Sequence, residues 1–221
     1  MPTSTVEQYI KTIYQQEERA PHETVPMKRL SEAMSVTPGT ATAMVKHLAS
    51  RGLVQYTPRK GVVLTAEGQN LALNMVRRHR LIETFLERVL QYDWSEVHDD
   101  AERLEHAVSD KFIQRIDAYL DFPATDPHGD PIPLADGTVP RRNVVPLDHC
   151  APGESVRISR VKTEDAAFLL LMKAHHLIPG AAIMVVDVNA TAGTVTVRPP
   201  EGATPFTLSI ATSAIIMVER T

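Results

Sequence analysis

The distribution of proline divides this chain of 221 residues into two parts. Residues 121–153 contain seven prolines, and proline has no amide proton and resists the interiors of helices and sheets. We therefore expect residues 123–153 to form a tether between separately folded domains. Before this stretch apolar residues recur at helical spacing, and after it they alternate. The sequence predicts a mainly α fold with a small C-terminal β domain.

The overall composition is that of a soluble globular protein, with 43% apolar and 23% charged residues. No window approaches about 18 consecutive apolar residues, and the N-terminus has no basic region followed by an apolar one. We expect a cytoplasmic protein without a membrane partner. The single cysteine, Cys150, cannot form a disulfide within the chain. A net charge of −4 gives no global attraction to nucleic acid, so any affinity for DNA must come from a local patch.

Residues 1–65 have the order of elements expected of a winged helix-turn-helix DNA-binding domain. The predicted elements are three helices and two strands, over 4–19, 27–34, 38–51, 53–56 and 62–64. Thr37 is a candidate N-cap, and Pro38 suits the first helical position of the third helix. A basic turn, residues 57–61, joins the two strands.

The third helix of this domain would enter the major groove through its N-terminal residues, which are small and polar. Their hydroxyl groups suit phosphates or base edges, and basic side chains at the hairpin tip suit phosphates. Residues 27–60 carry six basic residues and one acidic residue, a local charge of +5. The candidate DNA-binding residues are Thr37, Pro38, Gly39, Thr40, Ala41, Thr42, Lys46, Arg59 and Lys60. The alternative is a small helical subdomain with a solvated basic surface.

Residues 66–122 read as a helical domain of opposite charge. Helices are predicted over 66–92, 96–107 and 109–120, and residues 83–126 carry twelve acidic and four basic residues, a charge of −8. Imidazole and carboxylate groups, the usual ligands of manganese, iron and zinc, recur here at helical spacing. The candidate ligands are His79 and Glu83 on one helix, and His98, Glu102, Glu105 and His106 on the next. Surface ion pairs are the alternative interpretation.

Residues 154–221 read as a small barrel, because short alternating segments recur around one helix. The strands are predicted over 155–161, 182–188, 194–198, 205–210 and 214–219, and the helix over 163–176.

These motifs, in this order, resemble the diphtheria toxin repressor and manganese transport regulator family. The resemblance rests on five segments, which are Glu7–Tyr14, His79-x-x-x-Glu83, Val97-His98-Asp99, Glu105-His106 and the proline-rich Pro127–Pro133. It implies a winged helix-turn-helix domain, a helical dimerisation domain and an SH3-like β-barrel. It also implies a homodimer that binds double-stranded operator DNA and represses metal-uptake genes, without enzymatic activity or an organic substrate.

The resemblance also implies two metal sites. His79, Glu83 and His98 match the ancillary site, to which the C-terminal domain would add Glu164, or its neighbour Asp165. The primary site is matched by Glu102, Glu105 and His106, with Gln8 from the first helix.

Position 102 bears on the choice of metal. Iron-responsive members of the family carry cysteine there, and the harder oxygen of Glu102 suits Mn²⁺ better. Gln8 and Lys11 depart from the family pattern, in which position 8 carries Met or Asp as a primary ligand and some manganese-responsive members place a second carboxylate at position 11. We expect Mn²⁺ as the cofactor, with Fe²⁺ as the alternative and Zn²⁺, Co²⁺ or Ni²⁺ as substitutes in vitro.

Two other function classes stay open in the sequence. One is a metal-dependent hydrolase, although no nucleophile or oxyanion motif accompanies the ligands. The other is a winged-helix regulator that senses an organic ligand. Apolar residues over 81–120 would form either a dimer face or a monomer core; they are Leu86, Val89, Leu90, Leu104, Val108, Phe112 and Ile116.

Overall fold

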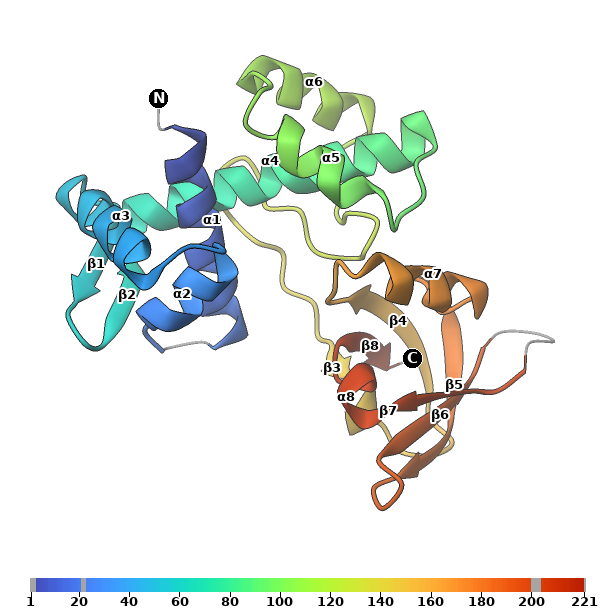
Figure 1. The fold of residues 1–221 in the computed structure, drawn as a ribbon. Coiled ribbons are helices and arrows are strands. Elements are labelled where there is room, and N and C mark those ends of the chain that lie inside the picture. The colour runs from blue at the N-terminus through green and yellow to red at the C-terminus, as the bar shows by residue number, and fades with distance from the viewer. Residues whose placement is uncertain (1–2, 21–22, 200–203, 221) are drawn as a thin grey trace. The chain divides into compact units, whose positions relative to one another are not determined.

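The computed structural model describes residues 3–20, 23–199 and 204–220 (Figure 1). The chain divides into two compact units. The first contains Met1–His79, Glu105–Ala107 and Pro133–Thr138, and the second contains Arg80–Leu104, Val108–Ile132 and Val139–Thr221. Within the described ranges no helix is long and apolar enough to cross a membrane.

The first unit contains the predicted DNA-binding elements. They are α1 (Ser4–Arg19), α2 (Met27–Ala33), α3 (Pro38–Ser50), β1 (Val54–Thr57) and β2 (Gly61–Leu64). The predicted cap of α3 is confirmed, since the Thr37 Oγ1 atom accepts a hydrogen bond from the Thr40 amide at 3.2 Å. The helix ends at Ser50, and Gly52 follows with a φ of 74°.

A single apolar core fixes these elements around α1. Ile10 and Ile13 are fully buried against residues of α2, α3 and the hairpin, which include Leu30, Val45, Leu48 and Val62. The hairpin is also tied to α1 by the Leu64 amide, which donates to the Glu17 carboxylate at 2.8 Å. The predicted winged helix-turn-helix order is therefore confirmed, and α1 is the element on which it is built.

The second unit begins within α4 (Ala66–Leu90), the helix that Thr65 caps. The last turns of α4 share an apolar core with α5 (Val97–Leu104) and α6 (Asp110–Tyr119), formed by Leu81, Ile82, Val97, Ile113, Ile116 and Ile132. The prediction of a helix to residue 107 is wrong, because α5 ends at Leu104. Glu105 and His106 lie in the turn that follows, where the Glu105 carbonyl accepts from Arg78 Nε at 2.9 Å.

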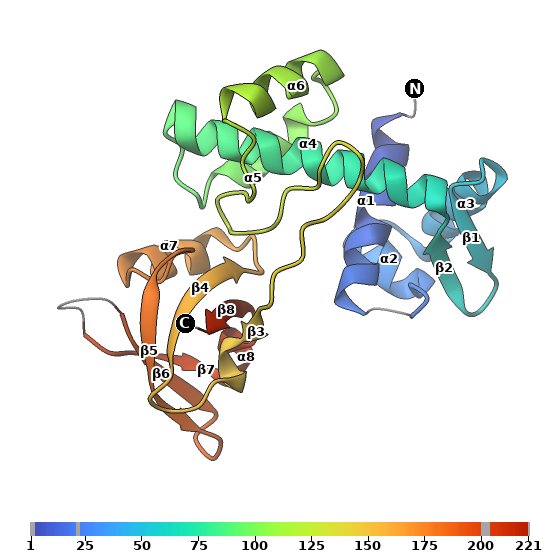
Figure 2. The ribbon, with the colours of Figure 1, turned by 180° about the vertical axis from the view of Figure 1, so that it is seen from behind.

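The C-terminal part of the second unit is a six-stranded antiparallel sheet in the order β3-β8-β4-β5-β6-β7. Its strands are β3 (Val145–Pro146), β4 (Ser155–Val161), β5 (Ala182–Asn189), β6 (Thr194–Arg198), β7 (Phe206–Ser209) and β8 (Ile216–Arg220). Two helices, α7 (Ala166–Ala174) and α8 (Ile210–Ser213), complete it, together with the 3-10 turn η1 (Leu147–His149) (Figure 2). The five predicted strands are present; β3 and α8 were not predicted, and α7 is shorter than expected because Asp165 caps it.

The proline-rich segment over residues 123–153, predicted to be a tether, is anchored by several buried side chains. Ile132 is buried in the helical core of the second unit, and Leu147 and Cys150 are buried in the core of the sheet. The physical reason is that proline removes only a donor. The carbonyl of Pro131 still accepts a hydrogen bond from Arg80 at 2.7 Å, and Pro146 pairs with β8 at the edge of the sheet.

Candidate metal centre

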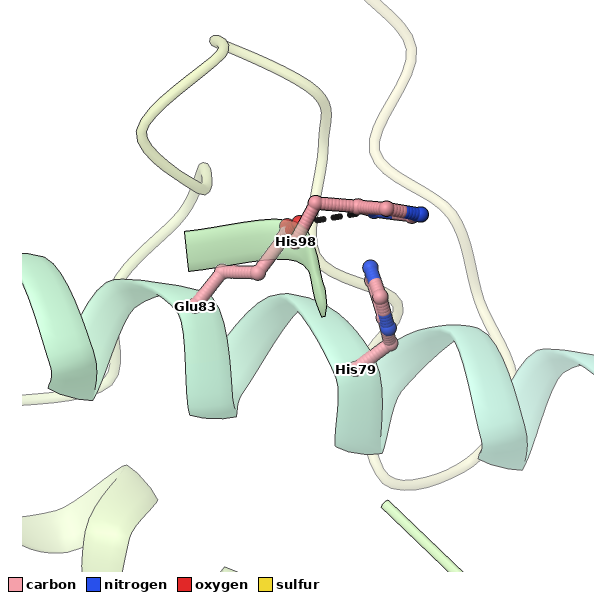
Figure 3. Close-up of side chains that lie close together, drawn as sticks. All are labelled: His79, Glu83 and His98. Carbon is pink, nitrogen blue, oxygen red and sulfur yellow. Dashed lines mark ion pairs between the residues drawn. The ribbon is translucent and has the colours of Figure 1, made fainter. Parts of the chain in front are cut away.

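Helix α4 carries two buried candidate ligands one turn apart, His79 and Glu83, with 6% and 2% of their surfaces exposed. His98 on α5 faces Glu83, and its Nδ1 atom lies 3.5 Å from the Glu83 carboxylate (Figure 3). A buried carboxylate is costly unless a cation or hydrogen-bond donors compensate it. The buried Glu83 carboxylate and the imidazole of His98 are donor groups that suit a divalent cation.

The loop before α7 contributes a second carboxylate to His98. Glu164 Oε2 lies 3.3 Å from His98 Nε2, so each ring nitrogen of His98 faces a carboxylate. Asp165, the alternative considered from the sequence, caps α7 by accepting from the Phe168 amide at 2.9 Å. The geometry thus separates the two neighbours, with Glu164 beside His98 and Asp165 in a structural position.

The first unit holds a second group of candidate ligands around His106. The Nε2 atom of His106 lies 3.2 Å from the Gln8 side-chain oxygen, and its Nδ1 atom lies 2.8 Å from Glu7. The neighbouring Glu105 is fully buried, and its carboxylate contacts both His79 and Lys11. Glu102 lies half-buried on α5 in the second unit, one helical turn after His98.

Two buried residues of this region escaped the sequence analysis as candidate ligands, Asp126 and His128. Together with Glu83 they offer ligand atoms that lie within 4.8 Å of one another. His128 Nε2 lies 2.9 Å from the Trp94 carbonyl, to which it donates, and Nδ1 lies 4.0 Å from the Glu83 carboxylate. Both residues belong to the proline-rich motif Pro127–Pro133 or adjoin it, which was the one available signal.

The environment of Asp126 is unusually demanding for a carboxylate. Burial raises the pKa of Asp126 well above its ordinary value, and the charges of Asp130 and Glu83 raise it further, while Arg80 opposes them. Arg80 Nε lies 3.5 Å from Asp126, and Arg160 donates to Asp130 at 2.7 Å. Arg80 and Arg160 therefore partly balance the negative charge of this group of carboxylates, which consists of Glu83, Asp126 and Asp130.

Cys150, the single thiol, does not belong to this centre. It is buried in the core of the sheet, and burial raises its pKa to about 11. Because the thiolate is the metal-binding form, this side chain is a poor ligand at neutral pH. The candidate ligands are therefore imidazole nitrogens and carboxylate or amide oxygens, a donor set that fits Mn²⁺, Fe²⁺ or Zn²⁺.

The candidate DNA surface is exposed as predicted at most positions. Thr37, Pro38, Gly39, Thr40, Lys46, Arg59 and Lys60 are exposed, and Thr42 is half-buried with its hydroxyl bound to the Pro38 carbonyl at 2.7 Å. Ala41 is a correction, because it is fully buried in the core of the first unit and has no surface to offer DNA. Ala43, three residues after Thr40, is exposed on the same helix.

Three family models match the chain in succession. Residues 1–62 match the N-terminal DNA binding domain of iron dependent repressors, residues 65–134 match their metal binding and dimerisation domain, and residues 145–220 match the FeoA domain. The iron-dependent repressor IdeR of Mycobacterium tuberculosis is 31% identical over 194 residues, which cover 82% of this chain and 83% of that protein. The chain belongs to the iron-dependent repressor family.

Solved structures of this repressor family show the same fold. A manganese-dependent transcriptional repressor in complex with manganese has a TM-score of 0.90 and 38% sequence identity, and the alignment covers 98% of this chain and 100% of that one. The manganese regulator SloR has a TM-score of 0.78 at 33% identity, with both chains fully covered. The match to the diphtheria toxin repressor of Corynebacterium efficiens, 37% identical over 134 residues, spans 60% of this chain and 57% of that protein.

Proposed function

We propose that this protein is a manganese-responsive transcriptional repressor whose binding to operator DNA depends on bound metal. The observation that carries the proposal lies within the first unit. His106 contacts Gln8 and Glu7, which belong to the same helix whose buried residues hold the DNA-reading elements together. A metal ion bound by His106 and Gln8 would act directly on α1, and through α1 on α3 and the hairpin of β1 and β2.

The proposed ligands are those predicted from the sequence. His79, Glu83, His98 and Glu164 would form the ancillary site, and Gln8, Glu102, Glu105 and His106 the primary site. When bound, the metal supplies a divalent positive charge that these carboxylates and imidazoles share. Metal must bind the DNA-competent state more tightly than other states, and a coupling of the usual size would change DNA affinity about 5- to 150-fold.

Manganese is proposed over iron because the donor set is rich in hard oxygen atoms and contains no thiolate. The related repressor solved in complex with manganese supports the same choice. Fe²⁺ is the second candidate, since the relatives from Mycobacterium are named iron-dependent and Gln8 is a neutral, weaker ligand.

The repressor is proposed to act as a cytoplasmic homodimer and not as an enzyme. Among the predicted interface residues, Leu90, Leu104 and Phe112 are exposed, whereas Leu86 and Ile116 are buried in the core of the second unit. The exposed apolar side chains Tyr119 and Phe122 extend the proposed face. In a dimer, two reading heads would meet successive major grooves about 34 Å apart.

The proposed domain boundaries are those predicted from the sequence. They are 1–65 for the DNA-binding domain, 66–122 for the metal-binding and dimerisation domain, 123–153 for the connection and 154–221 for the SH3-like domain.

Fluorescence anisotropy with DNA from upstream of the protein's own gene and of nearby transporter genes tests this function. The protein is titrated with chelator, then with Mn²⁺, anaerobic Fe²⁺ or Zn²⁺ at buffered free concentrations and one fixed salt concentration. We expect binding only with metal, and tightest with Mn²⁺. Equal binding in chelator would exclude metal control, and a higher rank for Fe²⁺ would replace manganese by iron.

Glu105→Gln is the informative variant in this assay, because it keeps a hydrogen-bond acceptor for Lys11 but removes the charge. We expect it to lose metal-stimulated DNA binding while remaining dimeric by sedimentation. Asp99→Ala removes an exposed carboxylate from the same acidic region and serves as the matched control. Unchanged stimulation in Glu105→Gln would contradict the proposed primary site.

A further inference from the structure

A lysine is buried in the first unit beside the proposed primary site. Lys11, on α1, is 2% exposed, and lysine is almost never buried unless it is paired. Its Nζ atom lies 2.9 and 2.8 Å from the two oxygens of Glu105, which is fully buried. It also lies 3.1 Å from His79 Nδ1. The ammonium group therefore has two carboxylate oxygens and an imidazole nitrogen around it.

These neighbours are the atoms that a divalent metal would use. An ammonium group and a metal ion compete for the same lone pairs, and two cations a few ångströms apart repel each other strongly in a site of low effective dielectric constant. The Lys11 ammonium group thus lies where a metal ion bound to Glu105 would lie, and Glu105 is its main counter-charge. A metal that takes Glu105 must displace the ammonium group or bind against its charge.

The position of Lys11 on α1 adds to this argument. Gln8, three residues earlier, contacts His106, so the same face of α1 carries a proposed metal ligand and the competing cation. Without metal, the pair between Lys11 and Glu105 ties α1 to the turn at residues 105–107, and with metal the ligands would make that link instead.

We propose that Lys11 is a built-in competitor for the metal, which neutralises Glu105 in the metal-free protein and raises the metal concentration needed for a response. The proposal rests on the proposed function, since it assigns Glu105 to the metal. Manganese binding then releases Lys11 from Glu105, and the strength of this internal ion pair sets the threshold of the sensor.

Replacing the lysine by an uncharged side chain of similar length tests the competition. We expect Lys11→Met to bind Mn²⁺ at least tenfold more tightly than the unmodified protein, measured by competition with a fluorescent chelator. Lys28→Met, at an exposed position where the side chain is 86% accessible, is the control and should leave Mn²⁺ affinity unchanged. Equal or weaker Mn²⁺ binding by Lys11→Met would overturn the proposal.

Thermal unfolding separates competition from damage to the fold. Without metal, Lys11→Met leaves Glu105 buried without this cation, so its melting temperature should fall. Saturating Mn²⁺ should restore it, and the metal-induced rise should exceed that of the unmodified protein. A rise no larger than in the unmodified protein would contradict the competition.

The unmodified protein offers a test that does not depend on folding of a variant. Lysine labelling by reductive methylation, followed by mass spectrometry, reports the accessibility of each amine. We expect weak labelling of Lys11 in chelator and several-fold stronger labelling in Mn²⁺, with Lys28 unchanged. Labelling of Lys11 that does not rise with Mn²⁺ would overturn the proposal. If the affinity, melting and labelling results are as expected but the unmodified protein shows no metal-dependent DNA binding, the proposed repressor function is wrong and the competition by Lys11 still holds.

Discussion

At the scale of single residues, the side chain of His106 is held on both sides by α1. Glu7 contacts Nδ1 at 2.8 Å, and Gln8 contacts Nε2 at 3.2 Å. A carboxylate that accepts from one ring nitrogen fixes the tautomer and leaves the other nitrogen as a ligand. Glu7 is therefore a positioning residue for His106, a role that was not predicted from the sequence.

This contact predicts the effect of changing Glu7. Glu7→Gln removes the charge behind His106, and we expect Mn²⁺ affinity to fall about 10- to 100-fold, the usual effect of losing such a partner. Chelator competition measures the affinity. Glu18→Gln, at an exposed position on the same helix, is the control and should not change it. An unchanged affinity in Glu7→Gln would show that His106 does not need this partner.

At the scale of elements, residues 124–132 form a compact connection between the helices and the sheet of the second unit. Asp126 Oδ1 accepts from the amides of His128 and Asp130, each at 2.9 Å, and the Val161 amide of β4 donates to the His128 carbonyl at 2.9 Å. Gly129, with a φ of 86°, lies so close to β4 that a Cβ atom would stand 2.0 Å from the Ser159 carbonyl oxygen. The approach of this turn to β4 requires glycine.

Two glycines with the same left-handed backbone conformation, which would strain any other residue, give a matched test of this packing. Gly153 has a φ of 87° but nothing within 4 Å of an added Cβ, so Gly153→Ala should cost only about 1 kcal/mol. Gly129→Ala adds a steric clash and should cost about 2–4 kcal/mol. Urea unfolding followed by the fluorescence of the single tryptophan, Trp94, measures both. Equal losses would mean that the turn moves away from β4 without cost.

A pH-dependent contact joins the loop after α4 to α7. Burial works to raise the pKa of Asp93, but hydrogen bonds from Lys173 and Ser95 outweigh it and lower the pKa to about 2 from an ordinary 3.8. A lowered pKa contributes stability above the ordinary value and loses it as the pH falls toward 2.

Asp93→Asn should therefore be less stable than the unmodified protein at pH 7, by about 0.5–1 kcal/mol because Lys173 is largely exposed. The difference should disappear as the pH approaches 2. Urea unfolding at several pH values checks this, with Lys173→Met expected to show the same trend. A difference that persists at low pH would assign the effect to packing instead of charge.

At the scale of the whole molecule, one residue links the helices of the second unit to its sheet. Trp94 belongs to the segment between α4 and α5, yet it is 6% exposed and packs in the core of the C-terminal sheet, stacked on His128. A residue from the segment between two helices therefore packs in the core of the sheet, so the loss of its side chain should weaken the sheet and its attachment to the helices.

Trp94→Ala tests this link. Removing a buried tryptophan should cost about 3–5 kcal/mol, and the helical and strand signals should be lost at the same lower urea concentration. Far-ultraviolet circular dichroism follows the unfolding. Leu170→Ala, at a position 51% exposed on α7, is the control and should change little. Unfolding of the sheet at its original urea concentration would contradict the proposal that Trp94 links the helices to the sheet.

Local features of the fold could be predicted from the sequence, because they depend on residues that are close together in the chain. Thr37 and Pro38 start α3, alternation marks the C-terminal strands, and helical spacing places His79 and Glu83 on one face of α4. Such features follow from backbone geometry and capping, which act over a few residues. The resemblance in motif order carried the family and with it the fold class.

Contacts between residues that lie far apart in the chain emerged from the three-dimensional fold. Lys11 meets Glu105 across 94 residues, and His106 meets Glu7 across 99. Neither pairing follows from the spacing of residues along the chain, because each depends on how the helices pack and on which polar groups are buried together. The proline-rich segment shows the same limit of local sequence patterns. Its prolines predicted a tether, whereas Ile132 and Leu147 are buried in apolar cores. Burial, a property of the whole fold, gave these residues their roles.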